Sequence, residues 1–254
     1  MITKHLGATL PIRLTALLSL ALAANTHAAT VSLGAAEAFA ILGGSTVTNT
    51  GSSVIVGQLG VSPGSSITGF PPGVVLSGSI HSTDVLANQA HTDAAGAYST
   101  LPGLTVTLDL TGQDLGGMIL QPGVYSFSST AQLTGTLTLD GGNTVDPLFV
   151  FLIGNGFTTA AGSSVVLING ADSGDAFFRV GDAATLGATS TFQGTILADD
   201  AISLGNGTSV AGRLLALNGE VTLINNSITV PVPEPTASIL SLVGGGALLL
   251  RRRK

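Results

Sequence analysis

Two stretches of the chain decide the fold, ATLGATSTFQGTILA at residues 184–198 and ISLGNGTSVAGRLLA at residues 202–216, and they align without a gap. The offset between them is 18 residues, and it places apolar residues on apolar residues and glycine on glycine. Leu186 aligns with Leu204, and Phe192 aligns with Val210. Self-similarity at a fixed short period is typical of a solenoid, in which each repeat packs only on its neighbours.

Less regular copies extend this repeat in both directions, FTTAAGSSVVL at 157–167 and VTLINNSI at 221–228. A repeat of this length with short alternating strands and glycine corners describes one coil of a β-helix with about three strands. We therefore predict a mainly β fold, a right-handed parallel β-helix of roughly triangular cross-section with about 18 residues per coil. The alternative is a β-sandwich, whose strands have no reason to keep one register over successive repeats.

One segment, from Ser82 to Leu101, has a helical period instead of a strand period. Its apolar positions are Val85, Leu86, Ala90, Ala94, Ala97 and Leu101. Ser82 is placed to cap the segment, Asp84 falls in its first turn, and Pro102-Gly103 stops it. We predict one long α-helix near 82–101, packed alongside the solenoid between early coils at 33–78 and later coils at 104–229.

The opening stretch LGAAEAFAILGGSTVTNTG at 33–51 resembles the start of a widespread microbial ice-binding protein family. Further similar stretches are GVSPG at 60–64, ITGFPPG at 67–73, PGVY at 122–125, LTGTLTL at 133–139 and AATLG at 183–187. Together they span nearly all of residues 31–229. The resemblance implies a discontinuous β-solenoid with a flanking helix, in which the first and last coils are neighbours in space.

The first 29 residues have the pattern of a secretory signal peptide. Lys4 and Arg13 precede an apolar run from Leu14 to Ala24, and Thr26-His27-Ala28 offers a small-residue cleavage site. The apolar run is shorter than the roughly 20 residues that a membrane-spanning helix needs. We therefore predict export, with the solenoid domain occupying residues 30–230.

The last segment, residues 231–254, has three parts: a short motif, an apolar stretch at 239–250 and a basic end at 251–254. The motif is Val232-Pro233-Glu234-Pro235. This arrangement resembles the PEP-CTERM sorting tail of Gram-negative bacteria, which implies processing by an exosortase-type enzyme and a secreted or cell-surface location. The alternative is an ordinary C-terminal anchor, because a cationic end holds either kind of tail in the inner membrane. In both readings the chain meets the membrane only through this segment.

Charge excludes one large class of function. Of the basic residues only Arg179 and Arg213 lie between the two ends, against thirteen acidic residues, so the net charge of the domain is −11. Such a surface has no basic stripe for phosphates, and we predict no nucleic-acid partner. The chain has no cysteine, so the exported fold must depend on packing and backbone hydrogen bonds.

Few residues of the domain are suited to chemistry. The only histidines between the two ends are His81 and His91, each within three positions of an aspartate, Asp84 or Asp93. Both pairs lie in the predicted helix or at its start, where a solvated or capping role is expected. The acids Asp172, Asp175, Asp182, Asp199 and Asp200 have turn-like neighbours, and turn chemistry accounts for them. We therefore predict no catalytic residues, no metal and no cofactor.

Strand alternation selects a candidate binding face. If Val165, Phe192 and Val210 point inward, their neighbours point outward on one side of the solenoid. These candidate residues are Ser164, Val166, Thr191, Gln193, Ser209 and Ala211, with Thr189, Thr208, Ser53 and Ser227 as extensions. We expect a flat, uncharged grid of small hydroxyl and methyl groups that orders a water layer and joins it to ice. The alternative is that these Thr and Ser residues have no binding role and are present because they favour strands and solvate an exported surface.

Two functions from different classes fit these features. The first is ice binding outside the cell, with inhibition of ice recrystallisation. The second is a structural or adhesive matrix protein that associates with exopolysaccharide. A β-helical enzyme acting on polysaccharides is disfavoured, because the domain has no evident group of converging titratable residues.

Overall fold

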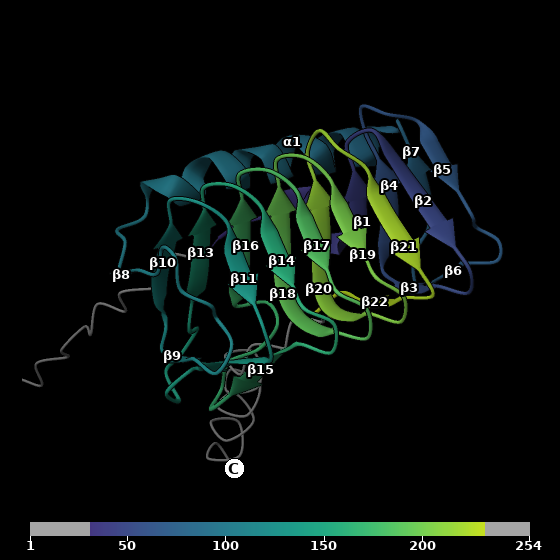
Figure 1. Ribbon diagram of the computed structural model, residues 1–254. Helices are drawn as coiled ribbons and strands as arrows, with labels where there is room; N and C mark the ends of the chain where they lie inside the picture. Colours follow the sequence, from purple (N-terminus) through teal and green to yellow (C-terminus); the bar gives the residue numbers. More distant parts are fainter. Residues whose placement is uncertain (1–30, 232–254) are drawn as a thin grey trace, which may run out of the picture.

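The computed structural model describes residues 31–231, a β-solenoid of parallel strands with one α-helix in this range (Figure 1). The predicted signal peptide and the predicted sorting motif at 232–235 lie outside the described residues. The mainly β solenoid with a long helix alongside is confirmed. No helix within 31–231 combines the length and apolarity needed to cross a membrane.

The solenoid has three sides, which we name faces A, B and C. Face A contains β8 (Leu108–Asp109), β10 (Gly123–Phe127), β13 (Phe149–Ile153), β16 (Ala176–Val180), the second halves of β18 (Thr191–Ala198) and β20 (Ser209–Ala216), β1 (Phe39–Gly43), β4 (Gln58–Val61) and β7 (Ile80–Ser82). Face B contains β11 (Ala131–Leu133), β14 (Phe157–Thr159), β17 (Ala184–Leu186), β19 (Ile202–Leu204), β21 (Val221–Ile224), β2 (Thr46–Thr50) and β5 (Ser66–Thr68). Face C contains β9 (Ile119–Leu120), β12 (Thr136–Asp140), β15 (Ser164–Ile168), the first halves of β18 and β20, β22 (Ser227–Thr229), β3 (Val54–Val56) and β6 (Val74–Leu76).

The 18-residue repeat is a structural register. Strands β18 and β20 pair in parallel over eight positions, from Thr191 opposite Ser209 to Ala198 opposite Ala216. Both strands bend from face C to face A at a glycine, Gly194 or Gly212, which has a positive φ of 130° or 153°. A Cβ on Gly212 would lie 1.8 Å from the carbonyl oxygen of Gly194, so the repeat requires glycine at this bend.

Strands from the two ends of the described chain lie side by side. On face A, β1 is hydrogen-bonded between β20 and β4. On face B, β2 pairs with β21, and on face C, β22 pairs with β3. Figure 1 shows the purple early strands beside the yellow strands from the end of the chain. Face B is therefore continuous across a break in the sequence.

The interior is filled by side chains that repeat from coil to coil. Tyr125, Phe151 and Phe178 stack along the axis, with ring centroids 5.4 Å and 4.4 Å apart. Phe157 and Phe192 pack against the same stack. Backbone hydrogen bonds between neighbouring strands set the spacing of the coils at about 4.8 Å, and both the inward rings and the outward side chains follow that spacing.

Helix α1 (Val85–Thr100) lies along the outside of face A. Its buried positions are Ala87, Ala90, Ala94 and Ala97. The last three belong to one apolar cluster with face A residues such as Val150 and Leu197, and their small side chains let the helix lie close to the sheet. The predicted capping residue was wrong: Asp84, and not Ser82, caps the helix, and its Oδ1 accepts the backbone N–H of Ala87 at 2.8 Å. Face A is thereby covered, which leaves faces B and C to solvent.

Candidate functional site

The six candidate residues that strand alternation predicted lie on the face C strands β15, β18 and β20. Thr191 is directly opposite Ser164 on one side and Ser209 on the other, and Gln193 is opposite Ala211. Ser227 extends the row beyond Ser209, as expected. Val166 departs from the grid: its strand partner is Thr138 on β12, because β15 and β18 share only the pair Ser164 and Thr191.

Three of the predicted extensions are not on this surface. Thr208 and Ser53 have no solvent-exposed area, so their assignment to a solvent-facing grid was wrong. The Thr208 Oγ1 donates to the carbonyl oxygen of Gly187 at 2.8 Å, and the Ser53 Oγ accepts the N–H of Asn226 at 2.9 Å. Both hydroxyls are thus engaged in hydrogen bonds to backbone groups of the corner between faces B and C. Thr189 is exposed but lies in the corner turn, with a φ of 56°.

Compared with the row of Ser164, Thr191, Ser209 and Ser227, the rest of face C is less polar. Toward one end its outward positions are aliphatic, including Val54, Val56, Val74 and Leu76, the last of which is 49 % exposed. At the other end Ile119 is 67 % exposed. The Gln193 side chain folds back, and its Nε2 donates to the carbonyl oxygen of Val165 at 3.1 Å. The hydroxyl grid on face C is therefore short and irregular.

Face B has a longer and more uniform row. One outward position from each of its seven strands aligns through the strand register, and we name this row the Thr column. Its members are Gln132, Thr158, Thr185, Ser203, Thr222, Thr48 and Thr68. Six of the seven carry a hydroxyl, and no hydrogen bond within residues 31–231 involves any of these six hydroxyls. They are free to bond water.

A second outward row lies two residues before the Thr column, and we name it the flanking column. Thr46 and Ser66, which pair with each other in β2 and β5, belong to it, and the registers of the other five strands, extended back by one residue, add Thr130, Gly156, Ala183, Ala201 and Glu220. Neighbouring members of one column are about 4.8 Å apart, because they lie on adjacent strands. The two columns are about 6.7 Å apart, because they occupy positions i and i+2 along each strand. The two columns form a lattice of small side chains, in which Glu220 is the only charged residue.

The strands of face B lie side by side along the length of the solenoid (Figure 1). The inward neighbours of the Thr column, such as Ala184, Leu186 and Val221, are fully buried or nearly so. A packed interior holds each strand in place, so the outward methyl and hydroxyl groups lose little further freedom on binding. Face B is thus a rigid, flat, nearly uncharged hydroxyl surface.

The family is settled by comparison with known proteins. The family model described as Ice-binding-like matches residues 41–229, which is most of the chain. The chain belongs to this ice-binding family. An ice-binding protein of Nostoc sp. is 52 % identical over 229 residues, covering 86 % of this chain and 84 % of the relative.

Solved structures of ice-binding proteins have the same fold. The ice-binding protein of the Antarctic ascomycete Antarctomyces psychrotrophicus superposes with a TM-score of 0.78 at 38 % identity, covering 80 % of this chain and all of that chain. An ice-binding protein from an Arctic yeast, whose structure is described as the basis of its antifreeze activity, superposes with a TM-score of 0.74 at 32 % identity, covering 81 % and 96 %.

A signal for face B was present in the sequence of this member of the ice-binding family. Thr185 aligns with Ser203 in the 18-residue repeat, and each stands between two apolar residues. The alternation rule therefore turns both outward, as it does Thr191 and Ser209. The predicted grid rested only on the strand of each coil that contains Val165, Phe192 or Val210, and it therefore left out face B.

The histidines have structural contacts. The His81 Nδ1 lies 2.6 Å from Asp84 Oδ2, and its Nε2 lies 3.0 Å from Gln58 Oε1. The backbone N–H of Ala87 and the His81 side chain lower the pKa of Asp84. His91 contacts the carbonyl oxygen of Leu217 at 2.8 Å and not Asp93. Within residues 31–231, no group of three or more His, Asp or Glu side chains is arranged to hold a metal ion.

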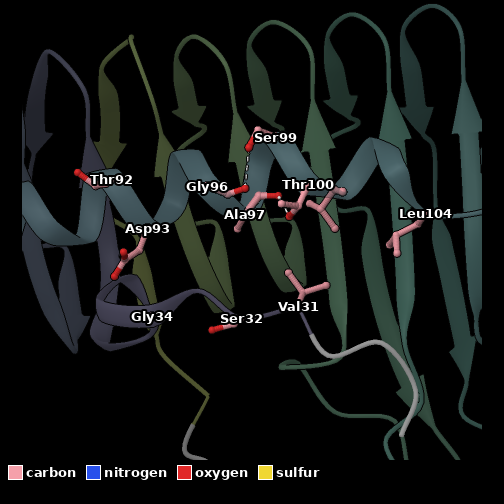
Figure 2. A pocket seen from close by; sticks show the side chains of 11 residues that line it. Val31, Ser32, Gly34, Thr92, Asp93, Gly96, Ala97, Ser99, Thr100 and Leu104 are labelled. Atoms are coloured by element: carbon pink, nitrogen blue, oxygen red, sulfur yellow. Dashed lines mark hydrogen bonds between the residues drawn. The ribbon is translucent and has the colours of Figure 1, made fainter. Parts of the chain in front are cut away.

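A groove of about 580 Å³ lies between α1 and the segment that precedes η1 (Gly34–Ala38) (Figure 2). Asp93 is its only titratable lining residue. The Asp93 carboxylate already accepts the N–H of Ala35 at 2.7 Å and the Nε2 of Gln89 at 2.8 Å. The groove therefore offers no free acid or base, and it is on the helix side of the molecule.

Proposed function

We propose that this protein binds ice through face B, with the Thr column as the centre of the contact. The observation that carries the proposal is the register of the Thr column, which sets one outward position of each of seven consecutive strands in one row. Ice presents a periodic surface, so a periodic array of small groups can meet it at many points at once.

The mechanism follows from the chemistry of threonine on a rigid sheet. Each hydroxyl can donate to one water molecule and accept from another, and each methyl group restricts the positions open to neighbouring water. Bridging waters hold nearly as well as direct hydrogen bonds, and those on face B are ordered at little cost because the sheet is already fixed. The ordered layer then merges with the ice plane.

We propose face C as a second, weaker contact, through Ser164, Thr191, Ser209 and Ser227 with Ala211, Gln193 and Val166 beside them. The support for this proposal is the strand register, which sets these four hydroxyl residues side by side and adds Thr136 beyond Ser164. Face C meets face B at the corner that contains Thr189. An ice crystal that reached this corner would contact both faces.

Tyrosine substitutions distinguish the faces. A tyrosine on an outward position lifts the ice plane from its whole neighbourhood, and it leaves the interior untouched. In an assay of ice recrystallisation, Thr185→Tyr on face B is expected to abolish most of the activity of the purified protein. Thr191→Tyr and Ser209→Tyr on face C serve as matched variants and are expected to cause a smaller loss.

Two other outcomes would assign the activity to another surface or the protein to another function. If only the face C variants lose activity, face C is the ice-binding surface. If the wild-type protein leaves ice grain growth unchanged, the alternative of a matrix protein associated with exopolysaccharide takes the place of ice binding.

We further propose that the protein acts outside the cell, as a secreted or cell-surface protein of a Gram-negative-type envelope. The signal-like segment at 1–29 supports export, and the motif Val232-Pro233-Glu234-Pro235 before an apolar stretch and a basic end supports processing by an exosortase-type enzyme. Mass spectrometry of the exported protein tests both ends. The expected product begins near residue 30 and lacks the basic end.

A further inference from the structure

Glu220 interrupts an otherwise uncharged lattice. It lies in the flanking column, directly before β21. The β21 registers begin at Val221, opposite Ile202 and Val47, and extending them back by one residue places Ala201 on one side of Glu220 and Thr46 on the other. Its side chain is exposed. Three other acids lie near face B. Asp182 and Asp200 are in the turns that precede the flanking column, and Asp114 bridges to Gln132 at the β11 end of the Thr column.

The Glu220 carboxylate also engages one hydroxyl of the lattice. The Thr46 Oγ1 donates a hydrogen bond to Glu220 Oε2 at 3.3 Å. The hydrogen of this hydroxyl is therefore turned toward the carboxylate, and Thr46 offers water only its acceptor lone pairs. The contact links a strand of the early coils to a strand near the end of the chain.

The backbone under Glu220 is held firmly. Its carbonyl oxygen accepts the N–H of Ile202 at 2.8 Å. The carbonyl oxygen of the preceding Gly219 accepts the N–H groups of Gly44 and Ser45, both at 3.0 Å. The charge consequently cannot leave the plane of face B through a movement of the loop, and only the side chain itself can turn away.

A carboxylate is poorly suited to contact with ice. It holds a strongly oriented hydration shell, and removing that shell without a compensating partner is costly. Arg179 and Arg213 are the only cations of the described chain besides its histidines, and both lie on face A. No opposite charge on face B offsets Glu220.

We propose that Glu220 limits the ice affinity of face B, by breaking the flanking column between Ala201 and Thr46. This inference rests on face B as the ice-contact surface. Without the carboxylate, the uncharged lattice extends over both columns, and the Thr46 hydroxyl becomes free to donate to water. Glu220 is therefore a residue that sets the strength of binding and not one that makes it possible.

Glu220→Thr and Glu220→Gln test the proposal, with Glu37→Gln as the matched control. Glu37 is the only other glutamate in the described chain, it is exposed, and it lies in η1, away from face B. At equal protein concentration, Glu220→Thr is expected to raise thermal hysteresis at least twofold. Glu220→Gln removes the charge but keeps the long side chain, so a smaller rise is expected. Glu37→Gln is expected to match the wild type.

Thr185→Tyr, measured in parallel, separates this inference from the proposed function. If Thr185→Tyr abolishes activity and Glu220→Thr leaves it unchanged or lower, the inference is overturned while face B remains the ice-contact surface. If Thr185→Tyr has no effect, both fail, because Glu220 then borders no contact with ice. A rise with Glu37→Gln equal to that with Glu220→Thr would assign the effect to net charge and overturn the inference.

Discussion

Thr185 on β17 and Ser203 on β19 lie directly opposite each other on face B, at the same 18-residue offset that relates the two repeats in the sequence. The pair is the centre of the Thr column, with two further members on the side of β11 and three on the side of β5. Because the column is one continuous row, the position of a substitution along it determines how much of the contact is lost.

A tyrosine at the middle of the Thr column is therefore expected to be more harmful than one at its end. Thr185→Tyr holds the ice plane away from the members of the column on both sides of it. Gln132→Tyr, on β11 at the end of the column, obstructs only the last position of the column. We expect a loss of thermal hysteresis of about tenfold for the first variant and less than twofold for the second. Both positions are exposed, so the free energy of unfolding is expected to change by no more than about 0.5 kcal/mol. Equal losses would argue against a contact along the whole column.

The buried hydroxyl of Thr208 is expected to matter for stability and not for ice binding. Thr208→Val keeps the shape of the side chain but removes the donor to the carbonyl oxygen of Gly187. A lost buried hydrogen bond costs about 1–2 kcal/mol, which denaturant unfolding can measure. Ser209→Ala, one residue further on the exposed side, is the control and is expected to stay within about 0.5 kcal/mol of wild type. Comparable losses of stability in the two variants would contradict the buried assignment.

These neighbouring residues show what the sequence can and cannot supply. The offset that aligns Phe192 with Val210 also aligns their inward side chains in the structure, so the repeat was sufficient to predict the solenoid and the register of β18 and β20. Alternation within a strand then placed Ser209 correctly outside. The same alternation turns Thr208 inward together with Val210, so the expectation of an exposed Thr208 departed from the rule. Thr208 stands at the corner just before β20, where its inward hydroxyl donates to a backbone carbonyl.

The choice between faces B and C needed three-dimensional information for a different reason. Each strand of a coil alternates in the same way, so Thr185 and Thr191 give equal signals in the sequence. The row on face B becomes longer only when β2 and β5 join it, and they come from a part of the chain more than 150 residues before β21. The repeat at 184–216 contains no trace of that pairing.

Thr189 offers a way to stabilise the fold without changing either exposed face. It has a φ of 56°, and the residues at the same corner of adjacent coils, Gly162, Gly207 and Asn225, also have positive φ values of 70°, 74° and 50°. A β-branched residue is strained in this conformation by about 1–2 kcal/mol, and glycine is not, although glycine loses more freedom on folding. We expect Thr189→Gly to raise the free energy of unfolding by about 0.5–1 kcal/mol. A lower midpoint of thermal unfolding would show that the Thr189 hydroxyl contributes more than the strain costs.

The pH dependence of stability is expected to contain an unusual contribution from Asp175, which directly precedes β16. Burial raises the pKa of its carboxyl from 3.8 to about 6, the N–H of Asp172 that it accepts lowers it, and the charges of Asp172 and Asp146 raise it further. Between about pH 4 and pH 6 the folded chain then binds more protons at this position than the unfolded chain does. Stability from this group is complete below pH 4 and is lost as the pH rises through 6, opposite in sign to an aspartate with a lowered pKa.

Asp175→Asn isolates this contribution, because the amide keeps an acceptor for the Asp172 N–H and carries no charge at any pH. At pH 7 the variant is expected to be more stable than wild type by about 1–2 kcal/mol, a value reduced from the full shift because water partly screens the site. As the pH falls from 6 to 4 the wild-type carboxyl becomes protonated in the folded state, so the advantage of the variant is expected to fade across that window. Denaturant unfolding of both proteins at pH 4, 5, 6 and 7 measures the difference. An advantage that stays constant over this range would show that the Asp175 carboxyl is not the group that titrates.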